Sequence, residues 1–373
     1  MDALMLPLNW QRVRLGDIGK PCMCKRVMKH QTTRYGEIPF YKIGTFGNTA
    51  DAFISKKLFL EYRTKYSFPK KGDILISASG TIGRAVIYDG KPAYFQDSNI
   101  VWIDNDETLV KNDFLFYAYS NVKWNTEHTT ILRLYNDNFR NTLIPLPPLN
   151  EQSAIANILS GLDRYLYSLR ALILKKEGVK KALSFELLSQ RKRLKGFNQA
   201  WQKVRLGDIA NYLTSNLSAE QITQQGKIKV YDVNNFIGYT DTTFISDKPY
   251  ISIVKDGSVG RVRILPPKTN ILSTMGALIA NHRTTTEFLF YLLSNFDFKN
   301  FTSGSIIPHI YFKDYKEKTI FLPPLNEQSA IANILSALDN EIASLKNKKR
   351  QFENIKKALN HDLMSAKIRV LEK

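Results

Sequence analysis

The sequence predicts an α+β protein in which two mixed α/β domains are joined by two long antiparallel helices that form a coiled-coil-like spacer. Two observations carry this prediction: the chain repeats itself, and each repeat closes on a long stretch with apolar residues at coiled-coil spacing. The clearest copy is LPPLNEQSAIANILSGLD at 146–163, which returns at 322–339 with one difference, Gly161 against Ala337. Two equivalent halves paired through their helices would have internal pseudo-twofold symmetry.

Further anchors recur in the same order, so the repeat covers the chain. WQRVRLGDI at 10–18 returns at 201–209, GTIGRAVI at 80–87 returns as GSVGRVRI at 257–264, and FLFYAYSN at 114–121 returns as FLFYLLSN at 288–295. The offset falls from 191 to 177 between the first two anchors, which predicts an insertion of roughly 14 residues in the first half. We therefore expect four segments: a domain at 1–145, a helix at 146–196, a domain at 197–321 and a helix at 322–373.

Each constant segment opens with a helix-start signal. Paired prolines keep the preceding chain out of the helix, and Asn150 and Asn326 stand at good N-cap positions. Apolar residues then recur three and four apart: Ile155, Leu159, Leu162, Leu166, Leu169 and Ile173 in the first copy, and Ile331, Leu335, Leu338, Ile342, Leu345, Phe352, Ile355, Leu359 and Leu363 in the second. The other copy is the obvious partner for each stripe. The alternative is that each helix packs on its own domain as ordinary core.

The charge of the chain favours a polyanionic partner. The formal net charge is +19, and Lys and Arg recruit phosphates through counterion release. A lysine-rich codon usage would give a similar excess without any such partner. The two cysteines, Cys22 and Cys24, exclude a disulfide framework and favour a reducing compartment. We expect a soluble, cytoplasmic protein without a signal peptide or membrane span.

The divergent segments alternate strands with polar loops rich in Tyr, Asn, Arg, Ser and Thr. These side chains suit base edges and phosphates in DNA, although they also simply make loops. The segments 41–50, 77–84, 133–140, 231–241 and 302–313 are therefore the candidate contacts. Their candidate DNA-binding residues are Tyr41, Lys42, Thr45, Asn48, Ser77, Ser79, Thr81, Arg84, Arg133, Tyr135, Asn136, Arg140, Tyr231, Asn234, Asn235, Tyr239, Ser258, Arg261, Ser303, Ser305, His309, Tyr311 and Lys313.

A search for catalytic chemistry finds no set of residues that could carry it. The glycines of SGTIGR and DGSVGR do not match a phosphate loop, and a tight turn between strands explains them better. The histidines have no metal-ligand spacing, and Asp73 with Asp89-Gly90-Lys91 only faintly imitates a nuclease cluster. We therefore expect no catalytic residue, no metal site and no bound cofactor in this chain.

These motifs resemble the specificity subunit of a type I restriction–modification system. The resemblance rests on W-x-x-V-x-L-G-D-I opening each half, on the SGTIG-type turn, and on I-P-L-P-P-L-N-E-Q-x-x-I-A-x-x-L-S-x-x-D beginning the first constant helix, repeated from L-P-P-L onward in the second. It implies two target-recognition domains that each read part of a split, asymmetric double-stranded DNA sequence, with the helices fixing the spacing. It also implies a non-catalytic subunit that docks two methyltransferase subunits. The adenine-methyltransferase and motor-nuclease subunits of the complex would use S-adenosylmethionine, ATP and Mg²⁺.

One feature qualifies the resemblance, and a second supports the spacing role that it implies. Gly304-Ser305 precedes IIPHI in the second half, whereas His128-Thr129 stands at the matching place in the first, so the two domains are expected to contact DNA differently. Residues 164–196 hold ten Lys and Arg against two Glu, which suggests that a basic helix face lies near the unread DNA between half-sites. The competing interpretations are a free-standing two-domain DNA-binding protein and an enzyme with an unrecognised site.

Overall fold

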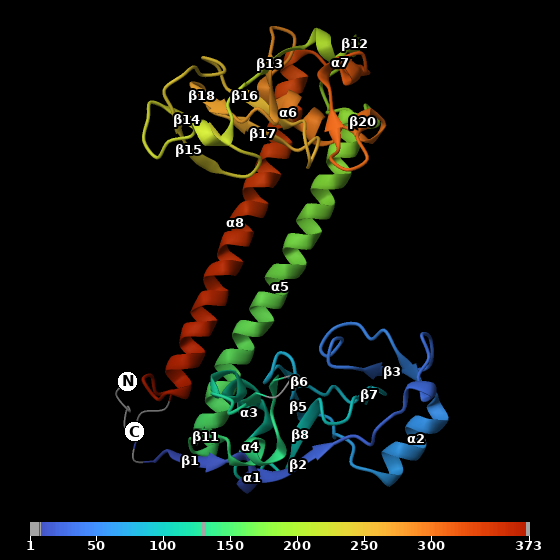
Figure 1. Cartoon of the computed structure of the whole chain (residues 1–373), viewed down its shortest axis with the longest axis vertical. Helices are drawn as coiled ribbons and strands as arrows, with labels where there is room; N and C mark the ends of the chain where they lie inside the picture. Colours follow the sequence, from blue (N-terminus) through green and yellow to red (C-terminus); the bar gives the residue numbers. More distant parts are fainter. Residues whose placement is uncertain (1–6, 8, 129–131, 371–373) are drawn as a thin grey trace. The chain divides into compact units, whose positions relative to one another are not determined.

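The computed structural model describes residues 7, 9–128 and 132–370 and divides the chain into two compact units. Unit 1 comprises Met1–Leu169 and Lys348–Lys373, and unit 2 comprises Arg170–Asn347. Each unit holds one divergent domain, the beginning of one long helix and the end of the other (Figure 1). The unit boundaries thus fall inside the helices, because each helix belongs to two hydrophobic cores.

The domain of unit 1 is built on two small sheets. An antiparallel sheet has the strand order β2 (Gly19–Met23), β8 (Ile100–Asn105), β5 (Ile74–Ser77), β6 (Ala85–Ile87), and a second sheet has the order β4 (Phe53–Ile54), β3 (Ile38–Tyr41), β7 (Tyr94–Phe95). Two short ribbons accompany them, β1 (Gln11–Arg14) with β11 (Leu143–Leu146) and β9 (Glu127–His128) with β10 (Leu132–Arg133). The short helices are α1 (Leu15–Ile18), α2 (Lys56–Lys65), α3 (Asn112–Ala118) and α4 (Asn136–Asn141).

The domain of unit 2 repeats this plan with different side chains. Its sheets have the orders β13 (Ala210–Thr214), β19 (Met275–Ala280), β16 (Tyr250–Val254), β17 (Val262–Leu265) and β15 (Phe236–Thr240), β14 (Ile228–Tyr231), β18 (Thr269–Ile271). The ribbons are β12 (Gln202–Arg205) with β22 (Thr319–Leu322) and β20 (Thr302–Ser303) with β21 (His309–Ile310), and the short helices are α6 (Thr286–Ser294) and α7 (Phe312–Tyr315). The mixed α/β domains predicted from the repeat are confirmed.

Helix α2 accounts for the predicted insertion. It follows β4 in unit 1, and Ser55 caps it by accepting a hydrogen bond from the backbone N–H of Leu58 at 3.2 Å. In the described part of unit 2, the matching interval between β15 and β16 contains bends and turns but no helix.

The long helices are α5 (Leu149–Leu188) and α8 (Leu325–Met364), each of 40 residues. Each begins one residue before the predicted Asn cap, because the carbonyl of Pro148 or Pro324 already accepts the first helical hydrogen bond, from Gln152 or Gln328. The helices also end earlier than predicted. Gln190 and Ala366 adopt matching left-handed conformations, with φ of 61° and 57°, and turn the chain back toward the partner helix.

The helices pair antiparallel within each unit. In unit 1, Tyr165 of α5 contacts Phe352 of α8 with 4.7 Å between ring centroids, and Asp163 pairs with Lys356. In unit 2, Lys176 pairs with Glu341 at 2.8 Å. Most of the predicted seam is buried or half-buried, but Ile355 is 49% exposed and lies outside it. The alternative of packing on a domain also holds, since Ile155 and Leu159 join the core of the unit 1 domain.

No helix in the described residues is long and apolar enough to span a membrane.

Candidate nucleic-acid interface

A glycine turn connects β5 to β6 in unit 1 and forms the centre of the candidate site. Gly80 and Gly83 have φ of 66° and 80°, which an L side chain rarely adopts. A Cβ at Gly83 would lie 2.1 Å from Nε1 of Trp124, so only glycine fits there. Inside the turn, the hydroxyl of Ser77 accepts a hydrogen bond from the backbone N–H of Arg84 at 3.0 Å and donates to the carbonyl of Thr81.

Unit 2 carries the same turn between β16 and β17. Gly257 and Gly260 have φ of 84° and 79°, and a Cβ at Gly260 would lie 2.6 Å from the ring of Phe298. The interpretation of both glycine pairs as tight turns rather than phosphate loops agrees with this geometry.

A loop from the second sheet meets each turn. Nη2 of Arg84 lies 3.4 Å from Oδ1 of Asn48, and Nη2 of Arg261 lies 2.9 Å from Oδ1 of Asn234. Both arginines are exposed. The matching contacts show that one architecture places an arginine beside an asparagine in each domain.

A short ribbon meets the opposite side of each turn. In unit 1, Ser79 forms a β-bridge with Arg133, and the backbone N–H of Leu134 donates to the carbonyl of Ala78 at 2.9 Å. In unit 2, Asp256 forms the equivalent bridge with His309. We call the three converging loops of each unit its rim: residues 41–48, 77–84 and 133–135 form rim 1, and residues 231–235, 254–261 and 303–311 form rim 2.

The structure brings most of the predicted residues to these rims, whereas Arg140 and Tyr239 lie outside them, and Ser77 and Ser79 lie in rim 1 with little exposed surface. Ser77 and Ser79 are buried, and their hydroxyls are engaged in hydrogen bonds to the carbonyl of Thr81 and the side chain of Asn99. Arg140 lies against Gly16 of α1 instead of the glycine turn. Tyr239 lies on β15 against Phe236, with 5.1 Å between ring centroids.

The remaining predicted residues lie on or beside a rim. Lys42 pairs with Asp51 at 2.8 Å, and Lys313 lies 5.5 Å from the ring centroid of Tyr311. The others are Tyr41, Thr45, Thr81, Tyr135 and Asn136 in unit 1 and Tyr231, Asn235, Ser258, Ser303 and Ser305 in unit 2. His128 ends β9, whereas Thr129 lies outside the described residues.

Sequence reasoning missed Asp256, whose Oδ1 lies 2.6 Å from Nδ1 of His309. It stands immediately before the glycine turn, where unit 1 has Ser79. Aligning SGTIGR with DGSVGR could have found it as the one acidic change between two otherwise similar turns.

The repeated stretch forms a buried connection, which we call the joint, between each domain and the helix pair. In unit 1, the carboxylate of Glu151 accepts hydrogen bonds from Nε1 of Trp10 at 3.0 Å and from Nε of Arg369 at 2.7 Å. In unit 2, Glu327 accepts from Trp201 at 3.0 Å and from Nη2 of Arg193 at 2.6 Å. Both carboxylates are almost fully buried, so these charges need their partners.

Glutamine completes each joint. The amide of Gln152, which is fully buried, donates to the carbonyls of Leu109 and Pro147 and accepts from the backbone N–H of Lys111 at 2.8 Å. Gln328 makes equivalent contacts in unit 2, donating to the carbonyls of Arg283 and Pro323. The near-identity of the stretch therefore has an internal structural cause, because these side chains connect each domain to the helix pair.

An aspartate further along each helix repeats the pattern. Asp163 accepts from the hydroxyl of Tyr117 at 2.9 Å and pairs with Lys356 of the opposite helix at 2.5 Å. Burial and the hydrogen bond to this carboxylate raise the pKa of Tyr117. In unit 2, Asp339 makes the same contacts with Tyr291 and Lys180.

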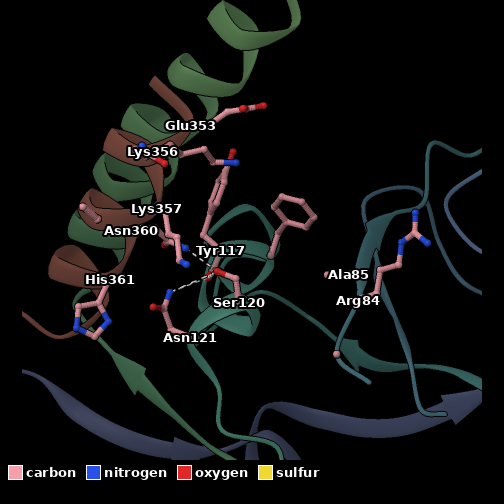
Figure 2. Close-up of a pocket in the computed structure, with 14 residues that line it drawn as sticks. Arg84, Ala85, Tyr117, Ser120, Asn121, Glu353, Lys356, Lys357, Asn360 and His361 are labelled. Atoms are coloured by element: carbon pink, nitrogen blue, oxygen red, sulfur yellow. Dashed lines mark hydrogen bonds between the residues drawn. The ribbon is translucent and has the colours of Figure 1, made fainter. Parts of the chain in front are cut away.

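A cleft of about 1070 Å³ lies beside rim 1 (Figure 2). Lys357, Asn360 and His361 of α8 line it from one side, and Arg84 of the glycine turn lines it from the other. Asn360 donates to the hydroxyl of Ser120 at 2.5 Å across the cleft floor. The cleft thus separates rim 1 from α8, and its lining includes the basic side chains of Arg84 and Lys357 and the acidic side chain of Glu353.

The fold and these two rims define a protein with two divergent recognition domains built on one repeated helical frame. The family model for the type I restriction modification DNA specificity domain matches residues 7–176 and again residues 198–354. The chain belongs to this family.

Individual relatives agree with that assignment. A putative type I restriction enzyme specificity subunit of Haemophilus influenzae is 61% identical over 152 residues, which span 40% of each chain. The MjaVIII specificity subunit of Methanocaldococcus jannaschii is 25% identical over 99% of this chain and 95% of its own length. The crystal structure of a type I restriction–modification S subunit from Mycoplasma genitalium shares the fold, with a TM-score of 0.64 at 20% identity over 96% of this chain and 98% of that one.

Proposed function

We propose that this chain is the non-catalytic DNA-recognition subunit of a type I restriction–modification complex. Each domain reads one half of a bipartite, asymmetric double-stranded DNA target, and the paired helices set the spacing between the halves. The observation that carries the proposal is the contrast between joints that match residue by residue and rims that differ. Two matching copies of the helical frame suit two copies of one partner subunit, whereas two different rims suit two different base sequences.

The chain docks two methyltransferase subunits, one on each copy of the constant frame, because two matching surfaces suit two identical partners. The exposed residues of the repeated stretch are candidates for this contact, since Leu149, Ile158, Leu325 and Ile334 are each between 36% and 47% exposed. The restriction subunits join through this complex. S-adenosylmethionine, ATP and Mg²⁺ are used by the other subunits, and the complex acts in the cytoplasm.

Methylated-base mapping tests the proposal directly. Cells that carry the chain with its methyltransferase subunit should methylate one bipartite sequence genome-wide, and the map gives both half-sites and their spacing. Co-purification of the two subunits supports the proposal. A stable solitary chain that binds DNA specifically would favour a free-standing DNA-binding protein, and methylation or cleavage by the chain alone would overturn the non-catalytic role.

The rims make a second test possible at the level of one loop. Exchanging the loop 41–48 of rim 1 for the matching loop of another specificity subunit should change one half of the methylated sequence and leave the other half and the spacing intact. A change in both halves would contradict independent reading by the two domains.

A further inference from the structure

An aspartate–histidine pair closes rim 2 and has no equivalent in rim 1. Oδ1 of Asp256 lies 2.6 Å from Nδ1 of His309. The backbone holds both residues in place, because the N–H of Gly257 donates to the carbonyl of Pro308 and the N–H of Ile310 donates to the carbonyl of Lys255, each at 2.9 Å. The pair is therefore a fixed part of the rim.

The matching position in unit 1 has different chemistry. There the bridge joins Ser79 to Arg133, and the Ser79 hydroxyl donates to Oδ1 of Asn99 at 2.7 Å. The arginine has only donors to offer, whereas a histidine can offer an acceptor. The same backbone bridge thus presents opposite hydrogen-bonding types in the two domains.

The carboxylate of Asp256 determines which ring nitrogen of His309 carries the hydrogen and which one can accept a hydrogen bond. An ionised carboxylate only accepts hydrogen bonds, so Nδ1 of His309 carries the hydrogen. In the neutral ring, Nε2 then holds a lone pair, and it has no hydrogen-bond partner among the residues that the structure describes. The side chain is 35% exposed, and the ring of Tyr311 lies beside it with 6.5 Å between centroids.

We propose that His309 is a specificity-determining residue of the second domain and that Asp256 is its positioning residue. Nε2 of His309 accepts a hydrogen bond from the exocyclic amino group of adenine or cytosine in the major groove, the two bases that offer a donor there. This inference rests on the proposed function, because it requires that rim 2 contacts DNA bases.

The test is binding of a duplex library in which the second half-site is randomised and the first is kept as mapped. The full chain with its methyltransferase subunit is used at pH 8. We expect one base pair of the second half-site to be specified through this contact, and His309→Ala should reduce discrimination at that base pair about tenfold. Asp256→Ala should relax the same position, and the double variant should be no worse than His309→Ala, because the two residues act as one unit.

Asp314→Ala provides the matched control. It removes an exposed carboxylate from α7, five residues from His309, and should leave every position unchanged. Unfolding midpoints identify any variant that is merely unstable, and His309→Phe, which keeps a ring of similar shape, gives a second measurement if His309→Ala unfolds.

Several outcomes would overturn the inference. Unchanged discrimination at every position of the second half-site in His309→Ala, equal relaxation in both half-sites, or additive effects of Asp256→Ala and His309→Ala would each contradict it. Absence of any sequence preference in the unmodified complex would instead contradict the proposed function itself, so the two failures are distinguishable.

Discussion

Glu151 and Glu327 occupy matching places in the two units, and each accepts hydrogen bonds from a tryptophan and an arginine. Ser79 and Asp256 also occupy matching places, yet one donates to an asparagine and the other pairs with a histidine. The first comparison shows contacts that folding requires, because a buried carboxylate tolerates no change of partner. The second shows contacts at the turn of each rim, where the backbone bridge is kept and the side chains differ.

The largest effect is expected from breaking a joint. Glu151→Ala and Glu327→Ala each leave a buried tryptophan N–H and an arginine without their shared acceptor, and each should lower the free energy of unfolding by about 3 kcal/mol. Urea denaturation followed by tryptophan fluorescence measures this, since Trp10 and Trp201 report on the two joints.

A matched control separates the joint from ordinary ion pairs of the helices. Glu341→Ala removes a carboxylate that is 44% exposed and pairs with Lys176, and it should cost only about 0.5 kcal/mol. Equal costs for Glu341→Ala and Glu327→Ala would contradict the special role of the joint. If Glu151→Ala and Glu327→Ala lower the free energy of unfolding by different amounts, the two joints differ in stability although their hydrogen bonds match.

A smaller effect is expected from the glycine turn of rim 1. Gly83→Ala introduces a Cβ against Trp124 in a left-handed conformation, and it should cost about 2–3 kcal/mol through strain and overpacking combined. Gly80→Ala is the matched control, because it shares the left-handed conformation but its Cβ meets only Ile43 at 3.8 Å. It should cost about 1 kcal/mol. Thermal unfolding compares the two, and similar costs would mean that Trp124 moves aside.

The fold could be predicted from the repeat because the repeated residues specify local structure directly. The helix pair follows from apolar spacing, and the insertion follows from the change in offset, which α2 explains. The joint could not be predicted, since nothing local to Glu151 indicates that Trp10 and Arg369 meet it from the two ends of the chain. Composition indicated the segments that form the rims, but it could not indicate that Ser77 is buried or that Asp256 contacts His309, because both follow from the fold.

The arginines of the two rims test whether the domains read DNA separately. Arg84→Ala removes the side chain that meets Asn48, and Arg261→Ala removes its counterpart beside Asn234. Each should weaken binding about tenfold through its own half-site only. Competition binding with duplexes altered in one half-site measures this, because the variant should stop responding to changes in the half-site that it no longer reads. Loss of response to both half-sites would contradict the separation.

The smallest effect on DNA binding is expected from the basic residues of α5. Their ion pairs determine which of them can be replaced without weakening the helix pair. Lys176 and Lys180 pair with Glu341 and Asp339, so neutralising them would weaken the helix pair itself. Lys175 and Lys181 are exposed and therefore suit the experiment.

If the exposed lysines of α5 lie near the DNA between half-sites, replacing Lys175 and Lys181 with Gln should flatten the salt dependence of binding. The logarithmic slope should fall by about 0.9 for each phosphate that a lysine no longer neutralises. The methylated sequence should stay the same, since phosphate contacts carry no base information. An unchanged slope would show that these lysines are only solvated, and a changed sequence would place a reading residue on the spacer.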